Sequence, residues 1–306
     1  MKNLGESIFI WLESYKRNSV KEATYDRLIT THRTLCNHYI SRVPPESLQT
    51  RDLQKYINDL TEAGYSQSTI KKQYHLLSAY ITYANAEGII PRPIHKNVNL
   101  PTQSNVIKKK REVDGYSKIE QIALLRELNT MKRTGYGVAL LMLEAGLRIG
   151  EAVALTWDDV DWDRRAIKIH KTLIRLANKN QMKIQEGAKS HTSNRIVPLS
   201  TKAYAMLEGL VEKATDLHGY IFQDADGGPI SYEAMRYQIS KACENANVEY
   251  RGQHVFRHTF ATNCYKNGAD VKILSKLLGH SSVAITYNTY IHLYGDALEE
   301  MRSVVA

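Results

Sequence analysis

The chain lacks the features that mark several large classes of protein. It has only three cysteines among 306 residues, and none of them forms a C-x-x-C pair. Three thiols cannot all pair with one another, so a disulfide scaffold is excluded and a reducing, cytoplasmic compartment is expected. The apolar run at residues 8–12 ends at Glu13 and is too short for a signal peptide. No later run is long enough to span a bilayer, so no membrane partner is expected.

Phosphate-binding loops and metal-ligand clusters are missing as well. No glycine-rich phosphate loop is present, so the sequence implies no nucleotide cofactor. His254 and His258 are four residues apart, as zinc ligands can be. However, no Glu follows His254 and no acidic third ligand lies nearby, as a zinc protease or a metal-dependent nuclease requires. We therefore expect neither a metal nor a cofactor.

The chain has an excess of positive charge, and most of it lies in the first third. Lys and Arg number 41 against 32 Asp and Glu, for a formal charge of +9. Residues 1–112 carry 17 basic and 10 acidic residues, whereas residues 113–306 carry 24 and 22. A basic domain suits a polyanion, most often nucleic acid, although a basic solvated surface is the alternative.

The periodicity of apolar residues predicts a mainly α (α+β) protein with two domains. The first, residues 1–90, reads as a helical bundle with helices at about 5–17, 22–41, 50–63 and 67–87. Residues 91–116 contain three prolines and a basic run, and they read as a linker. The second domain, residues 117–306, is predicted to be mostly helical with a small antiparallel β-sheet. Its helices are expected at about 118–129, 134–145, 149–156, 201–214, 231–247, 255–267, 270–278 and 283–293, and its strands at 166–173 and 195–199.

Cationic and imidazole side chains recur where helical segments begin or end in the second domain. Arg148 follows Gly146, Arg257 comes three residues after His254, and His280 follows Gly279. Two guanidinium groups and two imidazoles suit a phosphodiester, because arginine forks bind its oxygens and imidazoles transfer protons. Spacing alone does not show that these residues converge, and each one taken singly also suits a surface arginine or a structural histidine.

Three segments carry a resemblance to a known family. Gly-Leu-Arg-Ile-Gly-Glu at 146–151, His-Val-Phe-Arg-His-Thr-Phe-Ala-Thr at 254–262 and Leu-Leu-Gly-His-Ser-Ser at 277–282 resemble the signature boxes of the tyrosine recombinase (phage integrase) family, in the family's order. The resemblance covers about 118–292 in detail, and residues 1–90 more loosely resemble the family's core-binding domain. The length of the polar stretch 174–194 makes the chain most like integrases of phages and conjugative transposons.

The resemblance implies a site-specific DNA recombinase that cleaves and rejoins strands through a 3′-phosphotyrosyl intermediate, without metal or ATP, for integration or excision of a mobile element. Arg148 and Arg257 match the two clamp arginines of the family. His254 matches its proton-transfer histidine, and His280 matches the position that hydrogen-bonds the scissile phosphate. Glu151 matches an acidic position that steadies the basic residues. A non-catalytic DNA-binding regulator of the same fold is the alternative.

The family's lysine lies in a β-hairpin turn before a strand that resembles Arg195-Ile196-Val197-Pro198-Leu199. Lys189 fits that position, with Lys183 and Lys179 as rivals. The resemblance implies that this lysine is the general acid that protonates the 5′-oxygen leaving group.

The family's nucleophile is a tyrosine that follows the last box. Tyr287, Tyr290 and Tyr294 are spaced to share one helix face, so periodicity does not choose among them. The segment Thr286-Tyr287-Asn288-Thr289-Tyr290-Ile291-His292 resembles the family's T-x-N-x-Y-x-H ending, and this resemblance selects Tyr290.

The resemblance also implies partners. Double-stranded DNA is expected at specific core sites, between the bundle and the second domain. The expected phosphate contacts are Lys71, Lys72, Lys108, Lys109, Lys110 and Arg111. A homo-tetramer is expected to form on DNA through the C-terminal tail, residues 294–306, unless that tail packs on its own domain. Accessory DNA-bending proteins are possible partners. Many phage and transposon integrases carry an extra N-terminal arm-binding domain. This sequence starts directly at the bundle, so we expect that domain to be absent or to have been removed.

Overall fold

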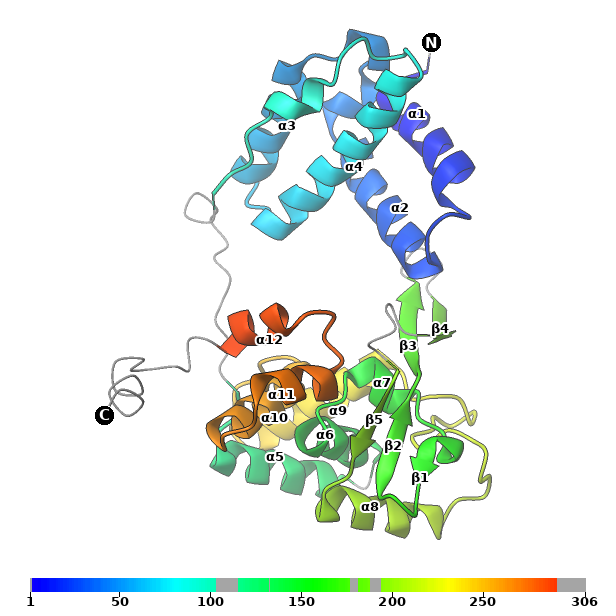
Figure 1. Cartoon of the computed structure of the whole chain (residues 1–306), viewed down its shortest axis with the longest axis vertical. Coiled ribbons are helices and arrows are strands. Elements are labelled where there is room, and N and C mark those ends of the chain that lie inside the picture. Colours follow the sequence, from blue (N-terminus) through cyan, green and yellow to red (C-terminus); the bar gives the residue numbers. More distant parts are fainter. Residues whose placement is uncertain (1, 103–114, 132, 177–180, 188–193, 291–306) are drawn as a thin grey trace, which may run out of the picture. The chain divides into compact units, whose positions relative to one another are not determined.

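The computed structural model describes residues 2–102, 115–131, 133–176, 181–187 and 194–290, with side chains through Tyr287 (Figure 1). The chain divides into two compact units, which are described separately. The first comprises residues 1–112 with 175–181, and the second comprises 113–174 with 182–306. Among the described residues, no helix combines the length and the apolar character needed to cross a bilayer.

The first unit is a bundle of helices. Its elements are α1 (Leu4–Trp11), a π-helical turn (Leu12–Lys16), α2 (Glu22–Cys36), α3 (Thr50–Glu62) and α4 (Gln67–Ala86), with 3₁₀ turns at Tyr39–Arg42, Pro45–Ser47 and Ile94–Asn97. α1 begins with a reciprocal cap between Asn3 and Glu6, and α4 begins at Ser66, whose hydroxyl accepts from the Thr69 amide. α2 packs against both α1 and α4. The core includes Leu4, Ile8, Leu12, Leu35, Tyr56, Ile70, Leu77 and Tyr80.

Two of the predicted helices in this unit are shorter or less regular than expected. The helix predicted at 5–17 changes from α to π geometry at Leu12. The helix predicted at 22–41 ends at Cys36 because the Asn37 amide bonds to the Thr34 carbonyl, three residues back. His38 then caps the following 3₁₀ turn through its ring nitrogen, an interaction that apolar periodicity does not reveal.

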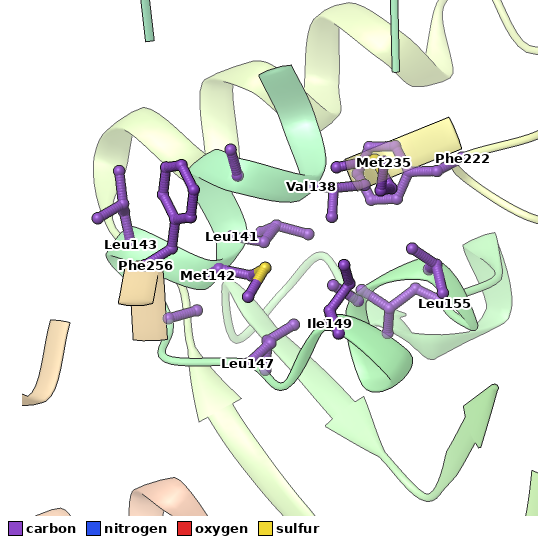
Figure 2. Packing of buried hydrophobic residues seen from close by; sticks show 14 of the residues in the cluster. Val138, Leu141, Met142, Leu143, Leu147, Ile149, Leu155, Phe222, Met235 and Phe256 are labelled. Atoms are coloured by element: carbon purple, nitrogen blue, oxygen red, sulfur yellow. The ribbon is translucent and has the colours of Figure 1, made fainter. Parts of the chain in front are cut away.

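The second unit is built around α6. Its helices are α5 (Lys118–Thr130), α6 (Gly135–Glu144), α7 (Ile149–Val153), α8 (Thr201–Val211), α9 (Tyr232–Asn245), α10 (Val255–Lys266), α11 (Val271–Leu278) and α12 (Val283–Tyr290), with a 3₁₀ turn at Trp157–Asp159. α6 packs against α5, α7, α8, α9 and α10. Most of its residues are buried, as expected of a helix that is apolar on nearly all sides. Figure 2 shows Val138, Leu141 and Met142 of α6 among core residues from neighbouring elements, such as Leu147 and Phe256.

Two small sheets lie wholly or mainly in the second unit. β1 (Val160–Asp161), β2 (Ala166–Ile169) and β5 (Arg195–Pro198) form an antiparallel sheet in the order β1-β2-β5. β3 (Lys171–Leu176) pairs with β4 (Gln181–Glu186). The predicted fold class, mainly helical with a small antiparallel sheet, is confirmed.

The strand predicted at 166–173 is in fact two strands that belong to different sheets. They separate at His170, where His170 Nε2 and Lys171 Nζ lie 2.7 and 2.9 Å from the carboxylate of buried Asp159. Because these two consecutive side chains share one carboxylate, they do not alternate as a continuous strand requires. β4 was not predicted, since its sequence is mostly polar and only Met182 and Ile184 pack against the core.

Gly146, in the turn between α6 and α7, occupies a position that only glycine suits. Its φ is +64°, and a Cβ there would lie 2.4 Å from Phe260 Cδ1. We expect Gly146→Ala to lower the free energy of unfolding by about 2–4 kcal/mol, through backbone strain and overpacking. Gly209, inside α8 with open space at its Cβ position, is the matched control. Gly209→Ala is expected to stabilise the protein by about 0.5–1 kcal/mol. Urea unfolding followed by circular dichroism measures both, and equal stability of the two variants contradicts the assignment.

Candidate active site

The C-terminal end of α11 is held by three arginines. A helix leaves its last carbonyl groups without partners inside the helix, and cations there are favourable. Here three consecutive carbonyls accept hydrogen bonds from three arginines that come from different parts of the second unit. The pairs are Leu277 O with Arg195 Nε at 2.7 Å, Leu278 O with Arg257 Nη2 at 2.6 Å, and Gly279 O with Arg148 Nη2 at 3.0 Å. The end of α11 therefore gathers three guanidinium groups around one point.

Glu151 of α7 lies among the same arginines. Its carboxylate binds Arg148 Nη1 at 2.7 Å and both terminal nitrogens of Arg195 at 3.0 and 2.7 Å, and it lies 4.0 Å from Arg257 Nη1. Only 6% of its side chain is exposed. Burial by itself would raise the pKa of Glu151, but the hydrogen bonds and charge of Arg195 and the charge of Arg148 outweigh it and lower the pKa to about 2. One carboxylate against three guanidiniums leaves the cluster positive.

Glu151→Gln tests the electrostatic role of this carboxylate. Because the pKa of Glu151 is lower in the folded state than in the unfolded state, its stabilising contribution is complete above pH ~4.5 and is lost as pH falls towards ~2. A pKa shift of this size corresponds to about 3 kcal/mol, which we expect Glu151→Gln to cost at pH 7. The difference in unfolding free energy between wild type and variant, measured by urea denaturation, should shrink on acidification.

Glu120→Gln is the matched control for that measurement. Glu120 pairs with Arg251 at 2.6 Å, but its side chain is 23% exposed. Its replacement is therefore expected to cost only about 1 kcal/mol or less. A loss from Glu151→Gln that is equally small, or that does not change with pH, contradicts the assigned role.

Arg257 is the most enclosed of the cations that the family boxes predict. It lies on α10, is 8% exposed, and donates from Nη1 to the Gly146 carbonyl at 2.7 Å. Its Nη2 also lies 3.2 Å from His280 Nε2. Arg148, at the N-cap of α7, has a side chain that is 36% exposed. Of these two arginines, Arg257 is thus buried and fixed by backbone carbonyls, whereas Arg148 reaches solvent.

The two predicted histidines carry lowered pKa values. Burial, followed by the positive charges of Arg257, Arg148 and Arg195, lowers the pKa of His280 to about 4, with Glu151 opposing. The pKa of His254, at the N-cap of α10, is lowered by partial burial of its ring and then by the positive charges of Arg257 and Arg148, although the residue as a whole is exposed. Both imidazoles are therefore neutral at pH 7 and can accept a proton.

The structure brings together five of the seven predicted site residues. Arg148, Glu151, Arg257 and His280 are linked by direct contacts, and the charges of the two clamp arginines act on His254. Lys189 lies outside the described residues. Tyr290 is the last residue of α12, but the structure describes only its backbone and not its side chain. The catalytic roles of the other six and the supporting role of Glu151 stay predictions.

Of the other candidate residues, some lie on described elements and the rest lie outside the described residues. Lys183, a rival of Lys189, lies on β4, and the second rival, Lys179, lies outside the described residues. Lys71 and Lys72 are exposed on α4. The basic linker residues Lys108, Lys109, Lys110 and Arg111 and the tail 294–306 also lie outside the described residues.

Arg195 is the site residue that sequence reasoning missed. It is the first residue of β5, and its side chain is 6% exposed and binds both Glu151 and Leu277. A signal was present in the strand pattern, because Arg195 and the buried Val197 lie two residues apart and so share one face of β5. An inward-facing arginine requires a buried acidic partner, and Glu151 is that partner.

Within the described part of the chain, no group of three or more His, Cys, Asp or Glu side chains is placed to hold a metal ion.

Comparison with known proteins identifies related sequences. A sequence profile of the phage integrase family matches residues 117–296. The chain is 27% identical to a tyrosine recombinase XerC-like protein of Caldanaerobacter subterraneus subsp. tengcongensis, over 95% of this chain and 79% of that protein. It is 24% identical to the integrase of Staphylococcus phage L54a, over 92% and 86%, and 24% identical to the transposase of transposon Tn916 from Enterococcus faecalis, over 84% and 66%.

Solved structures share the fold. The integrase of transposon Tn1549, in complex with a circular intermediate DNA, superposes with a TM-score of 0.84 at 20% identity and covers 99% of this chain and 100% of that chain. A lambda integrase dimer bound to a COC′ core site gives a TM-score of 0.67 at 17% identity, over 92% and 97%. At these identities the likeness establishes a common fold.

Proposed function

The chain belongs to the phage integrase family of site-specific DNA recombinases, and we propose that it cleaves and rejoins double-stranded DNA at specific core sites through a 3′-phosphotyrosyl intermediate on Tyr290. One observation carries the proposal. Three arginines from separate elements are fixed by three consecutive carbonyls at the end of α11, beside two neutral histidines. Such a cluster is suited to a single phosphodiester, whose oxygens accept hydrogen bonds from guanidinium groups.

The first step is an in-line attack. The phenol oxygen of Tyr290 bonds to the scissile phosphorus, and the bond from phosphorus to the 5′-oxygen breaks. A phenol has an ordinary pKa of about 10 and is a poor nucleophile at pH 7, so it needs stabilisation of its anion. Arg148 and Arg257 stabilise both the forming phenolate and the pentacoordinate transition state, because their positive charge is held in place before the reaction.

Proton transfer accompanies both bond changes. The phenol proton goes to neutral His254, whose lowered pKa keeps it unprotonated at pH 7. Lys189 donates a proton to the departing 5′-oxygen, since an alkoxide is a poor leaving group. The product is a 3′-phosphotyrosyl ester and a free 5′-hydroxyl. The ester retains the energy of the original bond, so attack by another strand's 5′-hydroxyl reverses the same steps and needs neither ATP nor a metal.

The wider arrangement is proposed on the family likeness. Residues 1–90 form the core-binding domain, residues 91–116 the linker and residues 117–306 the catalytic domain. Lys71 and Lys72, which are exposed on α4, contact DNA phosphates. Four copies assemble on two DNA sites through the C-terminal tail, with accessory DNA-bending proteins as further partners, and the reaction integrates or excises a mobile element.

The test begins with the DNA site. Duplexes bound by the full chain are selected from a random pool, and the selected site is rebuilt with a nick that traps the cleaved intermediate. Incubation in EDTA should give a protein–DNA adduct that survives denaturation. A selected site that is bound tightly but never yields an adduct, whichever strand and position carries the nick, favours the non-catalytic regulator and overturns the proposal.

A further inference from the structure

The two ring nitrogens of His280 contact different groups. Nε2 lies 3.2 Å from Arg257 Nη2, and Nδ1 lies 2.7 Å from the hydroxyl oxygen of Thr286. Thr286 belongs to α12 and is only 1% exposed. Neither the family boxes nor the proposed chemistry assigns a role to Thr286. The Thr286 hydroxyl nevertheless contacts the ring nitrogen of His280 that does not face Arg257.

These contacts fix where the ring proton of His280 lies. A guanidinium group only donates hydrogen bonds, so His280 Nε2 accepts from Arg257 and carries no proton. Arg257 Nη2 has two hydrogens, and the other one is directed to the Leu278 carbonyl. The charged groups around the ring are Arg257 on α10, Arg148 and Glu151 at α7, and Arg195 on β5, and the low pKa of His280 keeps it neutral at pH 7. Its single proton is therefore on Nδ1, where Thr286 accepts it.

This tautomer does not suit a bound phosphodiester. If His280 is to donate a hydrogen bond to a phosphate oxygen from Nε2, the proton must be on Nε2 instead. A hydroxyl both donates and accepts, so Thr286 can bond to Nδ1 in either tautomer. A methyl group in the same place cannot form a hydrogen bond with Nδ1 in either tautomer.

We propose that Thr286 is a positioning residue that, together with Arg257, holds His280 as the Nδ1–H tautomer while the site is empty and supports the Nε2–H tautomer when a phosphodiester oxygen replaces His280 at Arg257 Nη2. The exchange releases one proton from Nδ1 to water and takes one from water at Nε2, so the charge does not change. Thr286 also precedes Tyr290 by one helical turn, so the same bond ties the nucleophile's helix to the arginine cluster. The part that concerns DNA rests on the proposed function.

The resting tautomer is measured without DNA. Protein with ¹⁵N-labelled histidine is studied by NMR, and His280→Gln identifies the signals of His280. We expect wild type and Thr286→Ser to show a protonated Nδ1 and an unprotonated Nε2. Thr286→Val, which has the same shape without the hydroxyl, leaves the Nδ1 proton without its acceptor, so we expect the Nδ1 signal to shift and both ring signals to broaden. A protonated Nε2 in the wild type, or a Thr286→Val spectrum identical to the wild type, overturns the proposal.

The consequence for the reaction is measured on the nicked duplex described above. We expect Thr286→Val to slow single-turnover cleavage about 10–100-fold with unchanged DNA affinity, and Thr286→Ser to stay close to the wild type. Equal loss in both variants indicates a packing role and overturns the proposal, as does full activity of Thr286→Val. Failure of the wild type to form any adduct counts against the proposed function instead, because the NMR result does not depend on cleavage.

Discussion

Tyr290→Phe is expected to bind the selected DNA site with the affinity of the wild type and to form no denaturation-resistant protein–DNA adduct. The substitution removes one oxygen atom, the one that bonds to phosphorus, and leaves the ring in place. No other atom of the side chain can replace a phenolate in that bond, so the loss of adduct should be complete. Gel analysis of the denatured reaction measures the adduct, and a binding assay on the same duplex measures the affinity.

Tyr287→Phe is the matched control, because Tyr287 lies on the same helix and is 45% exposed. It should form the adduct at close to the wild-type rate. If Tyr287→Phe abolishes the adduct and Tyr290→Phe retains it, the nucleophile has been assigned to the wrong residue.

Arg257→Lys is expected to reduce the rate of cleavage by about 1,000-fold in protein that remains folded. Arg257 spans two backbone carbonyls and His280, and it uses both terminal nitrogens to do so. A lysine has a single nitrogen and no planar fork, so it cannot hold both carbonyls and present a second donor to a phosphate oxygen. Single-turnover cleavage of the nicked duplex measures the loss.

Arg251→Lys controls for a general effect of replacing arginine in this unit. Arg251 is partly exposed, stacks on the Tyr116 ring and pairs with Glu120, and it makes none of the contacts at the end of α11 described above. It should lower stability while leaving the cleavage rate of folded protein within about threefold of the wild type. Equal rates for Arg257→Lys and the wild type contradict the role given to Arg257.

The sequence was sufficient for most of the architecture because local signals and packing agree. Ser117 and Glu120, whose three-residue spacing is typical of a helix start, form a capping box at α5, with the Ser117 amide 2.7 Å from the Glu120 carboxylate. Gly279 ends α11 with a left-handed residue, as the sequence Leu-Leu-Gly-His indicates. Identification as a member of the tyrosine recombinase family is confirmed by the profile match over residues 117–296.

The arginine cluster could not be derived from local sequence. Arg195 meets Glu151 across 44 residues and Leu277 across 82, and no periodicity relates positions so far apart. Arg148 and Arg257 also donate to backbone carbonyls, which every residue carries, so residue type gives no indication of these contacts. The tautomer of His280 likewise depends on two contacts that only the folded chain creates.

The chemical nature of the protein–DNA bond tests the central claim most directly. The trapped adduct is digested with nuclease and protease, and the modified peptide is sequenced by mass spectrometry. We predict a single nucleotide attached through its 3′-phosphate to Tyr290, and a 5′-hydroxyl on the released DNA end that a polynucleotide kinase can label without prior phosphatase treatment. Attachment to another residue, or through a 5′-phosphate, contradicts the account.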